Sequence, residues 1–252
     1  HLLSEPGPSP SLALMTISEV VWIKEIWAKG ELRIKQGHSE ELAVKHDFIL
    51  EPLSWKNIST LQNTRWLNDE VVNAYLRLLD YVLEGQKGGK RRVVNSFFYP
   101  MVIGKGAEKS KILRLLSKRK IDVKTIDQLY IPVNVSNTHW CFLIIDFAAL
   151  SVIFCDSLKK KSFPTNEEYI LEFANTLLKE RGGLASSQLF TSIKVNRDFP
   201  VQNNHYDCGV FMLKGIDLIS RIDRPAFDQT DALYLRHLIC FELLNGKLSE
   251  TN

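Results

Sequence analysis

Three consecutive strand-like runs, with helix-like segments before and after them, constrain the fold of this chain more than any other feature. The runs cover Leu129–Val135, His139–Asp146 and Val152–Asp156. In the first run, apolar residues occupy every second position, which is the period of a strand. Strands that follow one another between groups of helices, instead of alternating with them, indicate an α+β fold.

Helical patterns lie on both sides of these strands. The stretch "WLNDEVVNAYLRLLDYVLEG" is predicted to form a helix that is capped by Asn68, carries acidic residues in its first turn and ends at Gly85. Further helices are predicted at Glu167–Arg181 and near Thr230–Asn245, and a short strand at Ser192–Val195.

Residues 1–44 are predicted to be an extension of a body that spans residues 45–252. Residues 1–15 contain three prolines and several serines, so we expect a flexible leader there. An amphipathic helix is predicted over Ile17–Ala28, with Gly30 as its stop. The pattern does not assign a role to this extension.

Composition limits the class of protein. The chain has 252 residues, of which 45% are hydrophobic and 24% charged, enough for a sizeable core. The four cysteines show no paired spacing, and we find neither a signal peptide nor an apolar run of membrane length. These features predict a reducing, intracellular setting. His237 with Cys240 is the nearest approach to metal-ligand spacing, but a second pair is lacking and we interpret it as helix packing.

The net charge of +3 is unevenly spread along the chain. Between Lys87 and Lys124, 12 basic residues stand against Glu108 and Asp122 alone. Such a block can attract an acidic partner surface, although a solvated face is the commoner outcome for a charge run. No aromatic residues are interleaved at 105–124, so direct nucleic-acid binding is not expected.

The stretch "QNNHYDCGVFMLK" places a cysteine where a helix is predicted to begin. Asp207 is a predicted N-cap and Cys208 would lie in the first turn, where backbone N–H groups and the helix dipole favour a thiolate. Gly209 would let the backbone approach a substrate closely. Two interpretations remain open: a nucleophile, or a cysteine that merely begins a buried helix.

A base for this thiol is predicted on the hairpin formed by "HWCFLIIDF" and "SVIFCD". With the turn centred between Phe147 and Ala148, His139 would lie directly opposite Asp156, with Cβ atoms about 4.5–5.5 Å apart. A carboxylate beside an imidazole fixes its tautomer and stabilises the imidazolium. A slip of one residue would move one partner to the other face of the sheet. The opposition favours Cys-His-Asp catalysis.

Acyl transfer also needs hydrogen-bond donors for the oxyanion. Gln202 lies six residues before Cys208, and its amide could join the Cys208 backbone N–H in stabilising the developing charge. A solvent-facing loop glutamine is the commoner alternative, and spacing alone does not select Gln202.

The motifs "WLNDEVVNAYL", "NTHWCFLIIDF", "FCDSL" and "QNNHYDCGVF", in this order, resemble the Ulp/SENP family of cysteine proteases, which process SUMO and remove it from proteins. The resemblance covers about residues 48–248. It implies a papain-like α+β fold with a mixed central sheet flanked by helices. It also implies a triad of His139, Asp156 and Cys208, with Gln202 at the oxyanion hole.

The same resemblance implies substrate-binding residues. In the family, the Trp of "WLND" and the Trp after the catalytic His clamp the Gly-Gly tail of the substrate, and these match Trp66 and Trp140. The Asp of "WLND", which contacts the ubiquitin-like body, matches Asp69. For the tryptophans taken alone, core packing is the better interpretation. The stretches "LSKRKIDVKTIDQLY" and "GKGAEKSK" depart from the family pattern, so the choice of modifier is less closely specified than proteolysis.

The implied function is a thiol isopeptidase and endopeptidase that cleaves after the Gly-Gly of a ubiquitin-like modifier, with SUMO as the first candidate. The resemblance implies no metal or organic cofactor and a monomer in the nucleus or cytoplasm, or in a host cell if the protein is a secreted bacterial effector. Three alternatives remain: a protease for ubiquitin or the cullin modifier, an effector-type acetyltransferase with a similar triad, and a catalytically silent modifier-binding module. "WLND" and "HW" argue against the acetyltransferase, and the intact triad argues against the silent module.

Overall fold

The computed structural model describes residues 8–9, 12–46, 52–86, 90–103, 108–159, 167–182 and 189–250. The chain divides into two compact units. Unit 1 combines the two ends of the chain, residues 1–78 and 200–252, whereas unit 2 is the continuous middle part, residues 79–199.

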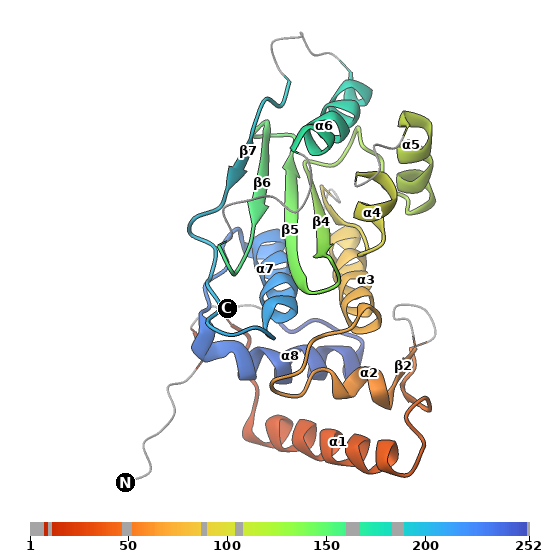
Figure 1. Ribbon diagram of the computed structural model, residues 1–252, viewed down its shortest axis with the longest axis vertical. Helices are drawn as coiled ribbons and strands as arrows, with labels where there is room; N and C mark the ends of the chain where they lie inside the picture. Colours follow the sequence, from red (N-terminus) through yellow and green to blue (C-terminus); the bar gives the residue numbers. More distant parts are fainter. Residues whose placement is uncertain are drawn as a thin grey trace. The chain divides into compact units, whose positions relative to one another are not determined.

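Unit 1 is mainly helical. Its elements are α1 (Ile17–Lys35), β1 (Leu42–Val44), β2 (Leu53–Ser54), α2 (Trp55–Ser59), the first part of α3 (Asp69–Gly85), α7 (Cys208–Ile222), η2 (Gln229–Asp231) and α8 (Ala232–Asn245). The strands β1 and β2 form an antiparallel pair. Helix α1 packs against α2 and α8, and α8 also packs against α7 (Figure 1).

Helix α1 is longer than the sequence pattern predicts. It begins after Thr16, whose side chain accepts a hydrogen bond from the Glu19 backbone N–H in a capping box. Gly30, the predicted stop, lies inside the helix and is buried. A Cβ atom at Gly30 would lie 3.2 Å from Cε3 of Trp55, so this glycine allows α1 to approach α2 closely. The helix continues to Lys35.

The residues just before α1 contact η2 and α8. The Ser9 backbone N–H and hydroxyl donate to the two carboxylate oxygens of Asp231, at 3.0 and 2.6 Å. The Met15 N–H donates to the Tyr234 hydroxyl at 2.7 Å. Part of the segment predicted as a flexible leader is therefore held against the rest of unit 1.

Helix α7 is almost entirely buried, including two charged residues, Lys214 and Asp217. The Lys214 ammonium pairs with Asp217 and lies 3.3 Å from Oε2 of Glu242 on α8 and 2.9 Å from the Tyr75 hydroxyl. Burial by itself lowers the pKa of Lys214, but the two carboxylates outweigh burial and raise that pKa. The network therefore keeps its buried charges paired and links α7 to α8.

Unit 2 contains a mixed five-stranded sheet in the order β3-β4-β5-β6-β7. The three central strands are antiparallel, whereas the edge strands β3 and β7 run parallel to β4 and β6. The strands are β3 (Arg91–Val93), β4 (Gln128–Val135), β5 (His139–Asp146), β6 (Ser151–Cys155) and β7 (Ile193–Val195). Strands β4 to β6 match the three predicted runs to within one residue at each end.

One face of this sheet packs against α4 (Phe98–Val102), α5 (Lys109–Lys118) and α6 (Glu167–Arg181). Alternate residues of the strands, such as Leu129 and Ile131 of β4, supply the sheet side of this core. Phe98 of α4 meets Phe173 of α6 edge to face, with ring centroids 5.9 Å apart. A mixed sheet with flanking helices confirms the predicted α+β class.

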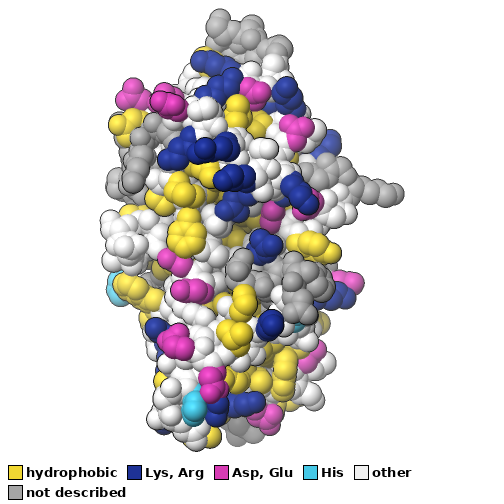
Figure 2. Space-filling view, turned by 90° about the vertical axis from the view of Figure 1, so that its right-hand side faces the viewer, with side chains coloured by type: hydrophobic (Ala, Val, Ile, Leu, Met, Phe, Trp, Pro, Cys, Tyr) yellow, Lys and Arg dark blue, Asp and Glu magenta, His cyan; other side chains and the backbone are white. Residues whose placement is uncertain are grey.

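The predicted basic block lies on unit 2. Figure 2 shows Lys and Arg side chains gathered on the upper part of the face that carries α5. Lys109, Arg114 and Lys118 of α5 are exposed. Lys109 forms an ion pair with Glu180 of α6 at 2.8 Å, so part of this charge is neutralised within the protein.

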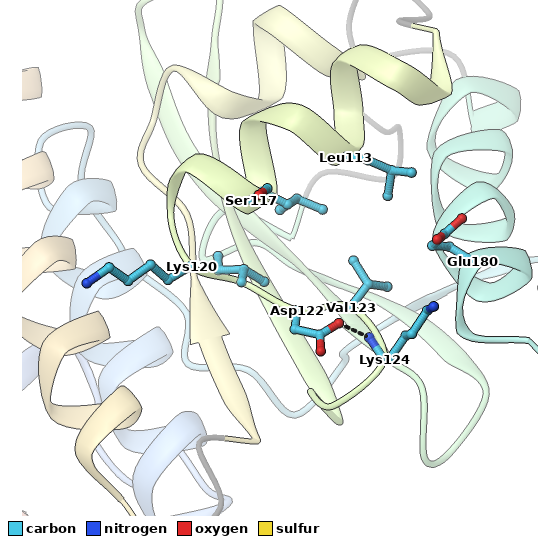
Figure 3. A pocket seen from close by; sticks show the side chains of 9 residues that line it. Leu113, Ser117, Lys120, Asp122, Val123, Lys124 and Glu180 are labelled. Atoms are coloured by element: carbon cyan, nitrogen blue, oxygen red, sulfur yellow. Dashed lines mark hydrogen bonds between the residues drawn. The ribbon is translucent and has the colours of Figure 1, made fainter.

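A pocket of about 350 Å³ lies between the end of α5, the turn that follows and α6 (Figure 3). Leu113 and Val123 give it apolar walls, while Lys124 and Glu180 supply charges of opposite sign. Mixed charge of this kind does not favour an anionic or a cationic ligand. The residues that line the pocket include none of the predicted site residues.

Candidate active site

The predicted site residues are divided between the two units. Unit 1 holds the predicted nucleophile, oxyanion donor and two substrate-binding residues, which are Cys208, Gln202, Trp66 and Asp69. Unit 2 holds the predicted base, its acidic partner and the second tryptophan, which are His139, Asp156 and Trp140.

His139 and Asp156 form a buried hydrogen-bonded pair. Nε2 of His139 lies 2.7 Å from Oδ1 of Asp156, and each residue is 4% exposed. Because an ionised carboxylate only accepts hydrogen bonds, Nε2 carries the hydrogen and donates it. The Leu158 backbone N–H donates to the same oxygen at 2.9 Å. In this neutral tautomer, Nδ1 is the ring nitrogen that carries no hydrogen.

The strand register behind this contact differs from the predicted one. The turn covers residues 147–150, and Phe142 pairs with Cys155, a shift of two residues from the predicted pairing. A shift of two leaves both side chains on the same face of the sheet. It also makes His139 a diagonal neighbour of Asp156, at a spacing of about 7–8 Å that long side chains can bridge. The predicted contact is confirmed, although the predicted register is wrong.

Cys208 is the first residue of α7 and is 4% exposed. Its predicted place in the first turn is confirmed, where backbone N–H groups lack intrahelical partners and the positive end of the helix dipole lies. At Gly209, a Cβ atom would lie 3.1 Å from Cβ of Leu67. A side chain at this position would crowd Leu67, so glycine allows α7 to pack closely against the residue that follows Trp66.

Asp207 occupies the N-cap position of α7, but its side chain makes no capping hydrogen bond. Its carboxylate accepts from the amides of Asn204 and Gln229, at 2.6 and 2.9 Å, and from Nε of Arg236 at 2.9 Å. The predicted capping role is therefore wrong. Asp207 instead joins the start of α7 to η2 and α8.

Gln202 is buried, with 4% of its surface exposed, which excludes a solvent-facing loop glutamine. Its side-chain amide donates to the Asn204 carbonyl at 2.7 Å. Oδ1 of Asn204 accepts from the backbone N–H groups of Tyr206 and Asp207, at 3.1 and 3.0 Å. The loop between Gln202 and Cys208 is thus held by its own polar side chains, and a role for Gln202 at the oxyanion remains a prediction.

The two tryptophans have different surroundings. Trp66 lies on the loop before α3 and is 51% exposed, whereas Trp140 lies on β5 and is 5% exposed. The core-packing interpretation is therefore wrong for Trp66. Asp69 is the first residue of α3, and Oδ1 of Asn68 accepts from the Val71 N–H at 3.1 Å, as predicted for the cap of this helix.

The candidate metal ligands His237 and Cys240 and the thiol of Cys155 are part of the packed interior. Burial raises the pKa of Cys155 and of Cys240 to about 12. The His237 ring lies against Trp27 with centroids 4.6 Å apart, and its Nδ1 bonds to the Leu233 carbonyl at 2.8 Å. These contacts agree with helix packing at His237 and Cys240.

The described ranges contain no group of three or more His, Cys, Asp or Glu side chains that could hold a metal ion. Within the same ranges, no helix is long and apolar enough to cross a membrane.

Sequence reasoning missed Arg236, whose side chain is entirely buried in α8. A signal was present, because Arg236 shares a face of the helix with the buried residues Ala232, Ile239 and Leu243. An arginine on an apolar helix face requires internal acceptors for its N–H groups.

The sequence model of one protein family matches residues 65–241, and its description is "Ulp1 protease family, C-terminal catalytic domain". A Caenorhabditis elegans protein named "Sentrin-specific protease" is 32% identical over 200 residues, which are 78% of this chain and 27% of that protein. "Ubiquitin-like-specific protease 1" of Saccharomyces cerevisiae is 25% identical over 195 residues, which are 77% of this chain and 30% of that protein. The chain thus spans about a third or less of the length of these two relatives.

Solved structures with a similar fold include the catalytic domain of a Chaetomium thermophilum Ulp1-like SUMO protease, with a TM-score of 0.74 and 21% identity over 96% of this chain and 94% of that one. The C-terminal Ulp1 protease domain in complex with Smt3, the yeast ortholog of SUMO, has a TM-score of 0.72 and 21% identity over 94% of this chain and 98% of that one. At these identities the similarity shows a shared fold. The predicted papain-like fold is thereby confirmed.

Proposed function

Because the chain belongs to the Ulp1 protease family, we propose that it is a cysteine peptidase that cleaves after the C-terminal Gly-Gly of a ubiquitin-like modifier, with SUMO as the first candidate. The observation that carries this proposal is the buried hydrogen bond between His139 and Asp156. It gives the imidazole one tautomer, with Nδ1 as the basic atom, which a thiol nucleophile needs.

The proposed reaction is acyl transfer through a thioester. Nδ1 of His139 takes the proton of the Cys208 thiol, and the sulfur attacks the carbonyl carbon of the terminal glycine. The Gln202 amide and the Cys208 backbone N–H donate to the resulting oxyanion. Collapse breaks the C–N bond, and the imidazolium gives its proton to the departing amine. Water then hydrolyses the thioester, with His139 again as the base, and restores the free thiol.

The proposed substrate preference rests on the aromatic residues and on the relatives. Trp66 presents a half-exposed indole on the loop before α3, as a clamp on an extended glycine tail requires. Asp69, three residues after Trp66, is proposed to contact the body of the modifier, and Trp140 to complete the clamp. Relatives named as sentrin-specific and ubiquitin-like-specific proteases support SUMO, or a related modifier, as the partner.

Further parts of the proposal concern organisation. We assign residues 45–252 to the catalytic domain and residues 1–44 to an extension, whose helix α1 packs on α2 and α8. We propose that the protein acts as a monomer inside the cell, in the nucleus or cytoplasm.

A panel of C-terminal electrophilic probes built on SUMO, ubiquitin and the cullin modifier tests the proposal. The SUMO probe should form a covalent adduct whose mass maps to Cys208, and it should react faster than the other two. Cys208→Ala should abolish the adduct, whereas Cys155→Ala, the matched control, should retain it. Reaction with the ubiquitin or cullin-modifier probe alone would reassign the modifier. Absence of any adduct at Cys208 in the folded wild-type protein would overturn the proposed function.

A further inference from the structure

Arg236 of α8 is the largest fully buried side chain in the part of the chain that the structure describes. Removing a guanidinium ion from water is costly unless its donors are satisfied by well-placed acceptors. Its Nε and one terminal nitrogen lie 2.9 and 2.7 Å from the same oxygen of Asp207, which is 2% exposed. The pair is therefore a buried, charge-neutral ion pair.

The remaining N–H groups of Arg236 bind backbone carbonyls in two separate segments. The first segment is residues 60–65, just before Trp66, where the carbonyls of Gln62 and Arg65 accept at 2.9 and 2.8 Å. Those of Thr60 and Leu61 complete the contact at 3.3 and 3.4 Å.

The second segment is the loop that leads into Cys208. Here the Tyr206 carbonyl accepts from Arg236 at 2.9 Å, next to the Asp207 carboxylate. The amide of Gln229 donates to the same carboxylate and accepts from the Asn203 N–H, both at 2.9 Å. One cation thus holds the loop of the predicted nucleophile and the loop of the exposed tryptophan.

Neither segment belongs to a helix or strand ladder that would set its position. Both are within unit 1, and the contact of Gly209 with Leu67 joins the same two stretches a second time. Lysine could not replace arginine here, because a single ammonium cannot reach Asp207 and both sets of carbonyls, whereas the planar guanidinium has five donors.

We propose that Arg236 and Asp207 are a positioning pair that fixes the spacing between the Trp66 loop and the first turn of α7. A peptide tail held at Trp66 then meets the Cys208 sulfur in register. Neither residue of the pair touches the substrate. This inference rests on the proposed function, because it assigns the tail and the sulfur their roles. A displacement of about 1 Å in such a site costs roughly 10²-fold in rate.

The test compares Arg236→Lys with a matched control that removes another buried ion pair of unit 1, the double variant Lys214→Met with Glu242→Gln. Three quantities are measured on the full chain: kcat/KM for a modifier with a fluorogenic C-terminal amide, the penultimate Gly-to-Ala preference of that substrate, and hydrogen exchange of residues 60–66 and 202–208. Arg236→Lys should lower kcat/KM by about 10²-fold and weaken the Gly preference. It should also raise exchange in both segments together, and the control should do none of these.

The proposal fails if folded Arg236→Lys keeps wild-type kcat/KM and Gly preference, if only one of the two segments exchanges faster, or if the control shows the same changes. Should Arg236→Lys lack a cooperative melting transition, Asp207→Asn takes its place with the same readouts. Wild-type protein that cleaves no Gly-Gly substrate overturns the proposed function instead. The exchange data then decide whether Arg236 still couples the two loops.

Discussion

Substitution of Asp156 by asparagine and by alanine should give very different losses of activity. Oδ1 of Asp156 accepts from both His139 Nε2 and the Leu158 backbone N–H. These two donors require an oxygen at that position, so the side-chain amide of Asp156→Asn should orient with its oxygen toward them. The imidazole would then keep the same tautomer, with Nδ1 still basic. Asp156→Ala removes the acceptor altogether.

The expected magnitudes follow from this geometry. Replacing a charge-assisted hydrogen bond by a neutral one loses about 1–1.5 kcal/mol. Since 1.36 kcal/mol corresponds to a factor of ten in rate, kcat/KM of Asp156→Asn should fall about tenfold. Loss of the correct tautomer has a much larger effect, about 10⁴-fold, and Asp156→Ala should approach that value.

The assay is release of a fluorogenic amine from the modifier C-terminus, with thermal melting of each variant as the folding control. Leu158→Pro is a matched perturbation, because it deletes the backbone N–H that would orient the side-chain amide of the Asp156→Asn variant. In a chain that keeps Asp156, the same substitution leaves the carboxylate in place. In the background of Asp156→Asn it should bring the activity down toward that of Asp156→Ala. If Asp156→Asn is folded but as inactive as Asp156→Ala, the two donors do not set the amide orientation and the reasoning is refuted.

Three further measurements test the site and its surroundings. Iodoacetamide near neutral pH should modify Cys208 before Cys155 and Cys240, whose pKa values of about 12 keep them protonated; peptide mass mapping that finds equal labelling would contradict this. Trp66→Ala should reduce the preference for Gly over Ala at the penultimate substrate position. It should lower the free energy of unfolding by less than the roughly 3–5 kcal/mol that truncation of a buried aromatic side chain costs. An unchanged preference would exclude the clamp. Burial lowers the pKa of His237, so protonation favours the unfolded chain. The contribution of His237 to the free energy of unfolding should therefore be constant above pH 6.5 and decline below it, by at most about 1.36 kcal/mol per pH unit. Denaturant titrations of His237→Gln should lack this decline. An equal decline in the variant would show that His237 is not its cause.

Local pattern was sufficient for most of the regular elements. Helix α6 and strand β5 have the predicted ends, because periodicity and alternation are properties of neighbouring residues. The hairpin register was missed because the turn contains Leu150 with φ of 48°. This is a left-handed conformation, which a leucine in the sequence does not indicate. Gly30 was misread as a stop, since a glycine that ends a helix and one that admits a neighbouring ring look alike in sequence.

The site could be predicted where its chemistry is local, and not where it depends on distant contacts. Cys208 at a helix start and His139 near Asp156 follow from short motifs. The partners of Arg236 lie as much as 176 residues away in the chain, so no window of the sequence contains the contact. Such contacts arise only when the fold brings several loops around one side chain.

The discontinuous composition of unit 1 has a consequence for biosynthesis. Residues 1–78 leave the ribosome before residues 79–252, but α1 has no α8 to pack on until residues 232–245 have been made. At 5–20 residues per second, synthesis of the intervening 79–199 takes on the order of 10 s, long enough for this continuous segment to fold first. Cys208 is translated only afterwards. A nascent chain therefore lacks Cys208, the proposed nucleophile, while its sheet forms, and this residue is added shortly before α7 and α8, the helices that surround it, are complete.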